Sequence, residues 1–384
     1  MRDPAQAHNH GVYLKDSVVE ELLGSPEQWS FVDATSDALF RVGAGGVRAL
    51  LETRDGKLEF VCFEERVLAH VKSALGYPAY YPMQPVRLQW PIRAVLMDLD
   101  GTSVRSEEFW IEMIERTVAT ILDAAADRQG QSAGCSRSAG CSRSAGGARR
   151  PGCAQPRFTL DETDRPYVTG QSVSEHLAYC IDKYAPGYPL EEARRHYMAH
   201  VRAAMKAIVA DDATGPAGRG PADAFRPTPG LREFLLGLKA MDIRIALVTS
   251  GLYEKAYPTI LAAFRAMDLG RPEEFYDAII TAGSLPRPGE VGTLGELCLK
   301  PHPWLYAEAC RVGLGIPFEQ RHHVLGIEDS TAGVMAVRLA GFAAVGLAGG
   351  NIEPTGARPL CHAHADRLAD ILTLIREGQA DSRQ

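Results

Sequence analysis

The chain contains no Cys-x-x-Cys pair, although it has eight cysteines. This excludes zinc ribbons and thioredoxin-type redox motifs, and we expect most cysteines to be small core residues or loop thiols in a reducing compartment. No segment approaches the roughly 18 consecutive apolar residues of a membrane span. The first residues, MRDPAQAHNHG, lack the apolar core of a secretory signal. We therefore expect a cytoplasmic protein without a membrane partner.

The chain also lacks an excess of positive charge and two common catalytic loops. Its net charge of −7 gives no general attraction to nucleic acid or to an anionic membrane. It has neither the Gly-x-x-x-x-Gly-Lys-Ser/Thr loop of nucleotide-binding proteins nor the Gly-x-Ser-x-Gly elbow of serine hydrolases. The content of 46% hydrophobic and 23% charged residues is that of a soluble globular protein, and 384 residues suffice for about two domains.

Residues 1–90 predict an N-terminal accessory region of mixed α and β structure. Val47–Leu51 and Leu58–Phe63 flank the pair Asp55-Gly56, which is a hairpin signal. The segment Glu65–Leu75 then predicts a short amphipathic helix. No pattern in this region indicates chemistry. A dimerisation surface, a second lid and a structural extension all remain open as its role.

From Ile92 onward, short apolar strands alternate with helices, which predicts a doubly wound α/β core whose parallel sheet is covered on both faces. About 145 residues separate the first strand from the second, far more than a crossover helix needs. We therefore expect the core at 91–106 and 227–384, with a helical domain inserted at 107–226. The predicted strands are Ala94–Met97, Ile243–Thr249, Ala278–Thr281, His323–Ile327 and Ala343–Leu347; the predicted helices are Glu107–Ala125, Val173–Tyr184, Leu190–Ala210, Leu231–Lys239, Tyr253–Phe264, Trp304–Val312, Ala332–Ala340 and Leu368–Arg376.

The inserted domain contains an internal repeat, in which the six residues Ser132–Arg137 recur as Ser138–Arg143. The repeat has no acidic and no large apolar residue, so it cannot bury a core, and we predict a disordered insert at about 129–157. Its arginines could contact phosphate, but a solvated loop is the favoured interpretation. The segment Asp211–Pro229, rich in Gly and Pro, is expected to be the return hinge.

The run from Arg93 to Thr102 is the most informative segment, because an apolar strand ends in Asp98 and Asp100. Alternate side chains of a strand point to opposite faces, but the second carboxylate can turn where the strand gives way to the Gly101 loop. Both acids can then serve one site at the carboxyl end of the strand. Buried acids need a counter-charge, which a divalent cation supplies. An acidic turn is the alternative, since Asp-Gly is a common turn pair.

Three later segments have polar residues at the corresponding place. Thr249-Ser250-Gly251 ends a strand, Lys300-Pro301 precedes a helix, and Glu328-Asp329-Ser330 ends another strand. Each alone has an ordinary explanation, such as a helix cap or a surface lysine. The carboxyl ends of parallel strands meet at one edge of the sheet, so together these residues converge on one crevice.

These four motifs, in this order, resemble those of the haloacid dehalogenase-like superfamily over about 92–105 and 229–377. The run GIEDSTAGVMAVRLAG at 326–341, together with the inserted helical cap, is similar to the branch that holds β-phosphoglucomutases and phosphoglycolate phosphatases. The resemblance implies a Rossmann-like core, a cap, a Mg²⁺ cofactor and a small phosphate ester as substrate. Sugar phosphates and phosphoglycolate-like compounds fit this class.

The resemblance also implies a role for each motif residue. Asp98 would be the nucleophile that forms an aspartyl-phosphate, and Asp100 would protonate the leaving oxygen and then deprotonate water. Mg²⁺ would be held by the Asp98 carboxylate, the Asp100 carbonyl and Asp329, with Glu328 acting through water. The phosphoryl oxygens would be bound by Thr249 and by the Ser250 amide in the turn that Gly251 completes, while Lys300 would neutralise the crowded carboxylates and the phosphate.

Two other functions remain as alternatives. β-Phosphoglucomutases have a histidine twelve residues beyond the nucleophile, where this chain has Trp110, and a cap arginine after a Gly-x-Ser segment. The corresponding segment here, Gly170-Gln171-Ser172, is followed by Val173, which cannot orient a second phosphate. Hydrolysis is therefore favoured over a mutase, and a non-catalytic metal-binding regulatory module is the alternative of another class. The presence of Asp100 excludes dehalogenases proper and phosphonate-cleaving members, which differ there.

One further cluster has metal-like residues. Cys361-His362-Ala363-His364 follows the last predicted strand, and we favour a loop over a metal site. The sequence does not identify the substrate or the oligomeric state.

Overall fold

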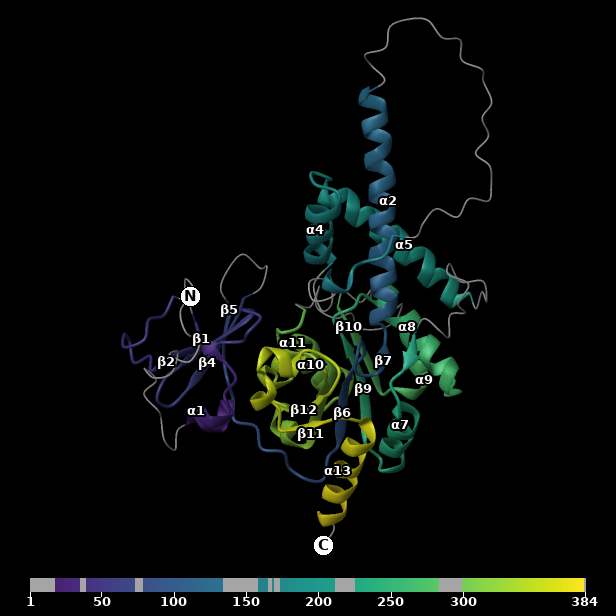
Figure 1. Cartoon of the computed structure of the whole chain (residues 1–384). Coiled ribbons are helices and arrows are strands. Elements are labelled where there is room, and N and C mark those ends of the chain that lie inside the picture. Colours follow the sequence, from purple (N-terminus) through teal and green to yellow (C-terminus); the bar gives the residue numbers. More distant parts are fainter. Residues whose placement is uncertain are drawn as a thin grey trace, which may run out of the picture. The chain divides into compact units, whose positions relative to one another are not determined.

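The computed structural model describes residues 18–34, 39–72, 79–133, 158–164, 168, 173–210, 225–282 and 299–382 (Figure 1). The chain divides into two compact units, one formed by Met1–Arg105 with Arg226–Gln384 and the other by Ser106–Phe225. No helix within the described ranges is both long and apolar enough to cross a membrane. Most of the predicted insert, the Gly170–Ser172 segment and residues 211–224 lie outside the described residues.

The core of the first unit is a parallel sheet, in which six described strands follow the order β10-β9-β6-β11-β12-β13. Every residue of β6, β11 and β12 is buried, as expected for parallel strands that are covered on both faces. The five strands predicted from the sequence are all confirmed. The strands are β6 (Ala94–Asp98), β9 (Arg244–Thr249), β10 (Ala278–Thr281), β11 (Val324–Glu328), β12 (Ala343–Leu347) and β13 (Ala363–Ala365).

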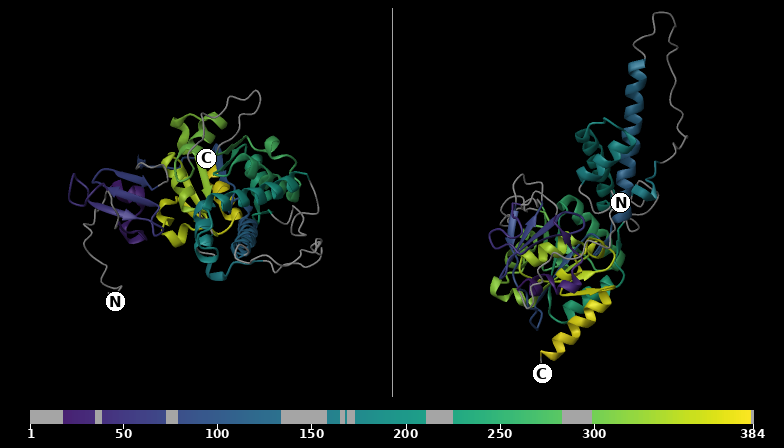
Figure 2. Two further views of the ribbon diagram at one scale, coloured as in Figure 1. Left: turned by 90° about the horizontal axis from the view of Figure 1, so that it is seen from above. Right: turned by 60° about the vertical axis from the view of Figure 1, so that its left-hand side comes forward.

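Helices cover both faces of this sheet. The crossovers through α7 and α8 run along the sheet in the direction from β6 toward β10. Those through α10 and α11 run in the opposite direction, toward β12, and right-handed crossovers in opposite directions lie on opposite faces. Accordingly α7 packs against α13, and α10 packs against α11 (Figure 2). The helices are α7 (Leu231–Ala240), α8 (Tyr253–Met267), α10 (Trp304–Glu308), α11 (Thr331–Leu339) and α13 (Leu368–Asp381), with the short α9 (Pro272–Phe275) and α12 (Ile352–Thr355).

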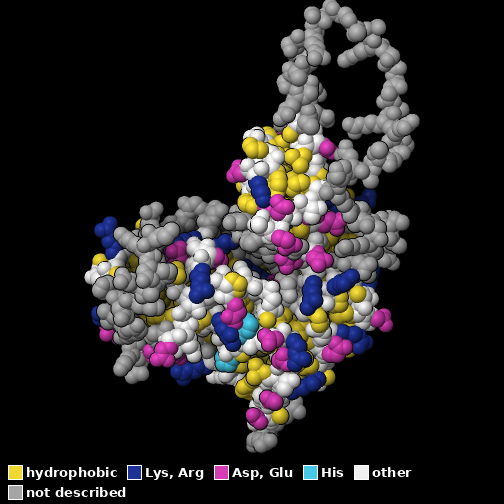
Figure 3. All heavy atoms as spheres, viewed as in Figure 1, with side chains coloured by type: hydrophobic (Ala, Val, Ile, Leu, Met, Phe, Trp, Pro, Cys, Tyr) yellow, Lys and Arg dark blue, Asp and Glu magenta, His cyan; other side chains and the backbone are white. Residues whose placement is uncertain are grey.

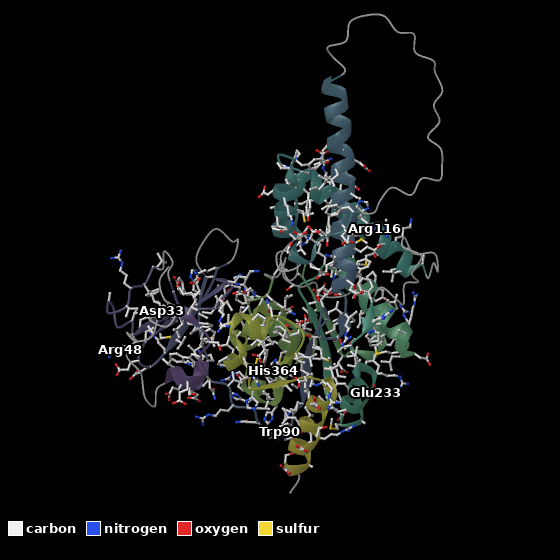
Figure 4. The ribbon with its side chains drawn as sticks, viewed as in Figure 1. Asp33, Arg48, Trp90, Arg116, Glu233 and His364 are labelled. Atoms are coloured by element: carbon white, nitrogen blue, oxygen red, sulfur yellow. The ribbon has the colours of Figure 1, made fainter. Side chains whose placement is uncertain are left out.

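Two local features of this core differ from the sequence prediction. The helix expected at Trp304–Val312 continues from α10 into a π-helical turn, η5 (Ala309–Gly313), where a Cβ on Gly313 would lie 2.7 Å from the Ala278 side chain. The loop expected at 361–364 is wrong for its second half, because His364, labelled in Figure 4, lies in the added strand β13. Gly346 permits this pairing, since a Cβ there would come within 2.7 Å of the His364 ring.

The N-terminal region of the first unit forms an antiparallel sheet, with the described strands in the order β1 to β5. The hairpin predicted around Asp55-Gly56 is confirmed by the pairing of β2 with β3. The helix predicted at Glu65–Leu75 is wrong, because this segment contains β4, whose alternating burial is that of a strand. The elements are α1 (Val18–Leu23), β1 (Val32–Asp33), β2 (Ala49–Glu52), β3 (Leu58–Cys62), β4 (Val67–Val71) and β5 (Ala79–Pro82).

One face of this antiparallel sheet shares a hydrophobic core with the parallel sheet. Phe60 and Ala69 belong to the same buried cluster as Leu96 on β6 and Leu305 on α10. Backbone contacts reinforce the junction, because the Arg338 guanidinium donates to Leu22 O at 3.3 Å and to Leu360 O at 2.5 Å. The N-terminal region is therefore an integral layer of the first unit.

The segment before β6 is held by the C-terminal helix. The Gln379 amide makes two hydrogen bonds to the backbone of Ile92, at 2.8 and 3.0 Å. The Trp90 ring, labelled in Figure 4, packs against Gly378, where a Cβ would come within 2.2 Å of the indole.

The face shown in Figure 3 carries basic and acidic side chains interspersed with one another.

The second unit is helical and consists mainly of α2 (Glu107–Ala133), α4 (Val173–Tyr184) and α5 (Leu190–Val209). The three predicted helices are confirmed, and α2 extends eight residues beyond its predicted end at Ala125. The buried Asp164 in η4 (Glu162–Asp164) accepts hydrogen bonds from Tyr179, Lys183 and Tyr184. Burial acts to raise the pKa of Asp164, but these bonds hold it below the usual value.

A short ribbon in the first unit lies where the chain leaves for the second unit and returns. Strand β7 (Val104–Arg105) pairs antiparallel with β8 (Arg226–Pro227). The Thr228 amide donates to Ser103 O at 2.9 Å and extends this pairing. The ribbon fixes both ends of the excursion next to the end of β6.

Candidate active site

The predicted site residues lie at the carboxyl ends of three neighbouring strands. Asp98 ends β6, Thr249 ends β9 and Glu328 ends β11, and these strands are adjacent in the order β9-β6-β11. Asp98 pairs in register with Val248, one residue before Thr249. Parallel alignment therefore brings three of the four motifs to one edge of the sheet, where open α/β sheets bind ligands.

Three carboxylates form a compact cluster at this edge. One oxygen each from Asp98, Glu328 and Asp329 lies within 4.8 Å of the other two. Asp98 is 6% exposed and Glu328 is fully buried. Burial, reinforced by the charge of Glu328, raises the pKa of Asp98 well above its usual range, and the same two causes raise that of Asp329 to about 7; the Lys300 ammonium opposes both shifts.

Lys300 is the cation that contacts this cluster within the described part of the chain. Its ammonium group pairs with Asp98, lies 2.7 Å from a Glu328 oxygen and donates to Val248 O at 3.2 Å. Burial acts to lower the pKa of Lys300, but the two carboxylates raise it above its usual value. Lys300 therefore remains charged at neutral pH. When all three carboxyl groups are ionised, they and the one ammonium leave two negative charges, which a divalent cation would balance.

Glycines provide the space that these carboxylates occupy. A Cβ on Gly333 would lie 1.9 Å from the Glu328 carboxyl carbon, and a Cβ on Gly101 would lie 2.1 Å from an Asp329 oxygen. Gly101 also has φ +86°, a conformation that other residues rarely adopt. The donor set and its close packing fit a small oxygen-liganded cation such as Mg²⁺.

Tyr306 is a member of the site that the sequence prediction missed. Its hydroxyl group donates to Glu328, and the Lys300 Nζ lies 5.2 Å from the centroid of its ring. Burial, followed by the charge of Glu328, raises the pKa of Tyr306 well above its usual value, so the phenol stays protonated and acts as a donor. A tyrosine on the buried face of a helix requires a polar partner for its hydroxyl group. The sequence signal that could have identified Tyr306 was therefore a tyrosine in the predicted helix that begins shortly after Lys300.

The Thr249-Ser250-Gly251 turn has the form of an anion-binding loop. The Thr249 hydroxyl accepts a hydrogen bond from the Gly251 amide at 2.9 Å, so its own O–H can still donate to a ligand. The Ser250 side chain accepts from the Lys300 amide at 3.2 Å. This bond links the second motif to the third.

Asp100 lies in the loop after β6, outside the three-carboxylate cluster. A second basic residue missed by the sequence prediction, Lys255 in the first turn of α8, interacts electrostatically with Asp100. Burial lowers the pKa of Lys255, and the charge of Asp100 opposes that shift. The loop is fixed by Ser103, whose hydroxyl donates to Asp98 O at 2.5 Å, and by Thr102, which donates to Asp329 at 3.4 Å.

Trp110, on which the expectation of hydrolysis rather than a mutase partly rests, belongs to the second unit. Its ring lies 4.9 Å from that of Phe109 and 6.1 Å from that of Phe225, measured between centroids. Trp110 thus packs against two aromatic rings of that unit.

Comparisons with known proteins place the chain in a family. The model of the haloacid dehalogenase-like hydrolases matches residues 92–341. No curated protein matches the sequence significantly.

Solved structures that resemble the chain include CbbY from Rhodobacter sphaeroides in complex with phosphate, with 20% identity over 73% of this chain and 96% of that one and a TM-score of 0.44. A predicted phosphoglycolate phosphatase from Haemophilus somnus has 17% identity over 74% of this chain and 97% of that one, with a TM-score of 0.47. A haloacid dehalogenase family hydrolase from Deinococcus radiodurans with bound phosphate and sodium has 22% identity over 76% of this chain and 97% of that one, with a TM-score of 0.42. All three TM-scores are below 0.5, so the assignment rests on the family model, which covers more than half of the sequence. The chain belongs to the haloacid dehalogenase-like hydrolases.

Proposed function

We propose that this protein is a cytoplasmic, Mg²⁺-dependent phosphatase that hydrolyses a small phosphorylated metabolite, such as a sugar phosphate or a phosphoglycolate-like compound. The observation that carries the proposal is the position of Asp98, which is paired with Lys300 and clustered with Glu328 and Asp329. In this arrangement a carboxylate that would serve as the nucleophile lies beside charges that could receive a phosphate and a metal ion.

Asp98 would attack phosphorus, forming a bond between its carboxylate oxygen and phosphorus while the bond to the ester oxygen breaks. Asp100 would give its proton to the leaving oxygen, which departs as an alcohol. In the second half, Asp100 would take a proton from water as the water oxygen attacks phosphorus. The acyl-phosphate bond then breaks, which releases inorganic phosphate and restores the Asp98 carboxylate.

The remaining motif residues would bind and neutralise the phosphate. Thr249 O–H and the Ser250 amide, in the turn that Gly251 completes, would donate to its oxygens. Lys300 would balance part of the charge shared by Asp98 and the phosphate, as it already contacts Asp98 and Glu328. Such fixed donors act most strongly on the charge that develops in the transition state.

Mg²⁺ would be held by the Asp98 carboxylate, the Asp100 carbonyl and Asp329, with Glu328 acting through water, and when bound it would screen negative charge during phosphoryl transfer. The raised pKa values of Asp98 and Asp329 support this proposal. The nucleophile is the deprotonated carboxylate, and a positive charge bound beside Asp98 would favour that form.

The test is phosphate release from a panel of phosphorylated metabolites, measured with Mg²⁺ and with a chelator. We expect release from at least one small phosphate ester with Mg²⁺ and its loss with the chelator. A phosphosugar mutase would instead yield an isomerised sugar phosphate. A metal-binding regulatory module would bind Mg²⁺ and leave every ester of the panel intact, and either result would overturn the proposal.

A further inference from the structure

We propose that the N-terminal antiparallel sheet positions the catalytic lysine, through a hydrogen bond between Tyr81 on β5 and His302, two residues after Lys300. This inference rests on the proposed function, because it assumes that Lys300 takes part in turnover. It gives residues 1–90, which lie outside the matched family region, a role in the active site.

The two tyrosines of β5 point to opposite faces of the sheet. Tyr81 pairs in register with Ala69 and packs against the shared hydrophobic core. Tyr80 pairs with His70 and stacks on its ring, with centroids 4.4 Å apart and planes at 16°. Adjacent residues of a strand alternate in this way. The chain thus offers two neighbouring tyrosines, of which only Tyr81 is on the face toward the parallel sheet.

Tyr81 reaches the lysine segment directly. Its hydroxyl group lies 2.7 Å from His302 Nδ1, and the two rings meet edge to face with centroids 5.7 Å apart. His302 is 3% exposed. A buried imidazole nitrogen needs a hydrogen-bond partner, so this contact fixes the orientation of the ring. The residues are separated by 221 positions in the chain, which makes the contact a tertiary link between the antiparallel sheet and the segment that carries Lys300.

His302 in turn holds the backbone around Lys300. The His302 amide donates to Leu299 O at 3.0 Å, which closes a turn over Lys300 and Pro301. On the other side of the turn, the Lys300 amide donates to Ser250. The Lys300 backbone is therefore held by the parallel sheet through Ser250 and by the antiparallel sheet through His302.

The position of this backbone determines where the ammonium group lies. Lys300 Nζ contacts Asp98, Glu328 and Val248 O together, so a shift of its backbone disturbs the geometry of these three contacts. Charge-assisted hydrogen bonds depend strongly on geometry, and misplacement of a catalytic group by about 1 Å can reduce the rate by about 10²-fold. Loss of the Tyr81 hydroxyl should produce part of this effect.

The test compares Tyr81→Phe with Tyr80→Phe in the full-length chain, using p-nitrophenyl phosphate and saturating Mg²⁺. Both substitutions keep the ring and remove one hydroxyl group. We expect Tyr81→Phe to reduce kcat by about tenfold with little change in KM, in proportion to a partial loss of positioning. Tyr80→Phe should retain the wild-type kcat. A purely structural role for Tyr81 would lower the melting temperature and leave kcat unchanged well below it, which would overturn the proposal.

A substitution at the other end of the bond provides a rescue test. His302→Asn keeps a side-chain oxygen that can accept the Tyr81 O–H, whereas His302→Leu keeps none. We expect His302→Asn to retain more of kcat than His302→Leu, and the difference to vanish when Tyr81→Phe is also present. An equal difference in both backgrounds would contradict a link through this bond.

Hydrogen exchange separates failure of this inference from failure of the proposed function. If the wild-type protein hydrolyses no phosphate ester, the proposed function fails. Hydrogen exchange of the non-proline amides in 299–306 then still tests the link between Tyr81 and His302. Faster exchange there in Tyr81→Phe, and not in Tyr80→Phe, is the result expected. Unchanged exchange in Tyr81→Phe would overturn the link even if the protein is a phosphatase.

Discussion

The first unit contains buried carboxylates in both of its sheets, but the two groups differ in charge balance. In the antiparallel sheet, Glu52, Glu59 and His70 lie opposite one another on β2, β3 and β4. Lys72 pairs with Glu52 and lies 3.8 Å from Glu59, while His70 lies 3.5 Å from Glu59. Two carboxylates thus face Lys72 and His70, of which the histidine carries a charge only when it is protonated.

In the parallel sheet, three clustered carboxylates share Lys300. Their surplus of negative charge is unfavourable in a buried site without a ligand, and it is reflected in the raised pKa values of Asp98 and Asp329. Buried acids alone therefore do not indicate catalysis. A group in which each acid has a basic neighbour, here called balanced, stabilises a sheet, whereas a group with a surplus of acids at the carboxyl end of parallel strands is suited to a cation and a phosphate.

Asp98→Asn is the change with the largest expected effect. It keeps the size of the side chain and removes the nucleophile, so kcat for phosphate release should fall by roughly 10³-fold or more. Steady-state phosphate release measures this, with circular dichroism to confirm folding. Near-wild-type kcat in a folded variant would refute the role of Asp98.

Metal binding should depend on pH because of Asp329. The pKa of Asp329 is raised from 3.8 to about 7. In the protein without metal, the contribution of Asp329 to folding stability is therefore greatest at low pH, where the side chain is protonated. This contribution is lost as the pH rises from about 4 through about 7. Mg²⁺ requires the deprotonated form. The increase in melting temperature caused by Mg²⁺ should therefore be larger at pH 8 than at pH 6. Equal increases at both pH values would contradict this account.

Tyr306→Phe should have an intermediate effect. It removes the hydroxyl that donates to Glu328 and keeps the ring beside Lys300. Hydrogen-bonding partners of metal ligands typically contribute about 10- to 100-fold to metal affinity. We expect the Mg²⁺ concentration for half-maximal activity to rise about tenfold, measured by titration. An unchanged requirement would show that Tyr306 acts only in packing.

Glu59→Gln should have the smallest effect on activity. It removes a buried charge from the balanced group, so we expect the free energy of unfolding to fall by about 1–3 kcal/mol. The value of kcat should stay within about twofold of wild type, because Glu59 lies on the face of the sheet opposite to Tyr81. Denaturant unfolding and steady-state kinetics measure the two quantities. A loss of kcat comparable to that of Asp98→Asn would remove the distinction between the two groups.

The parallel core could be predicted from the sequence because its strands are continuous apolar runs that end in distinctive polar residues. The strand β4 could not, because apolar residues at 67, 68, 71 and 75 also fit a helical period, and pairing with β3 and β5 decides the outcome. The three-residue strand β13 carries too little pattern to be recognised and depends on the space beside Gly346.

The motif residues of the candidate site could also be read from the sequence, whereas their supporting contacts could not. Tyr306 contacts Glu328 across 22 positions and Tyr81 contacts His302 across 221. Such contacts depend on how elements pack rather than on local spacing. The charge balance that separates Asp98 from Glu59 likewise becomes visible only when the partners are brought together.

The most direct test of the account is to identify the covalent intermediate. The protein should be quenched with acid during turnover of p-nitrophenyl phosphate with Mg²⁺, digested, and analysed by mass spectrometry. We predict a phosphoryl group on the peptide that contains Asp98, absent with a chelator and in Asp98→Asn. Turnover without a phosphorylated peptide, or with the phosphoryl group on another residue, would contradict the assignment of Asp98 as the nucleophile.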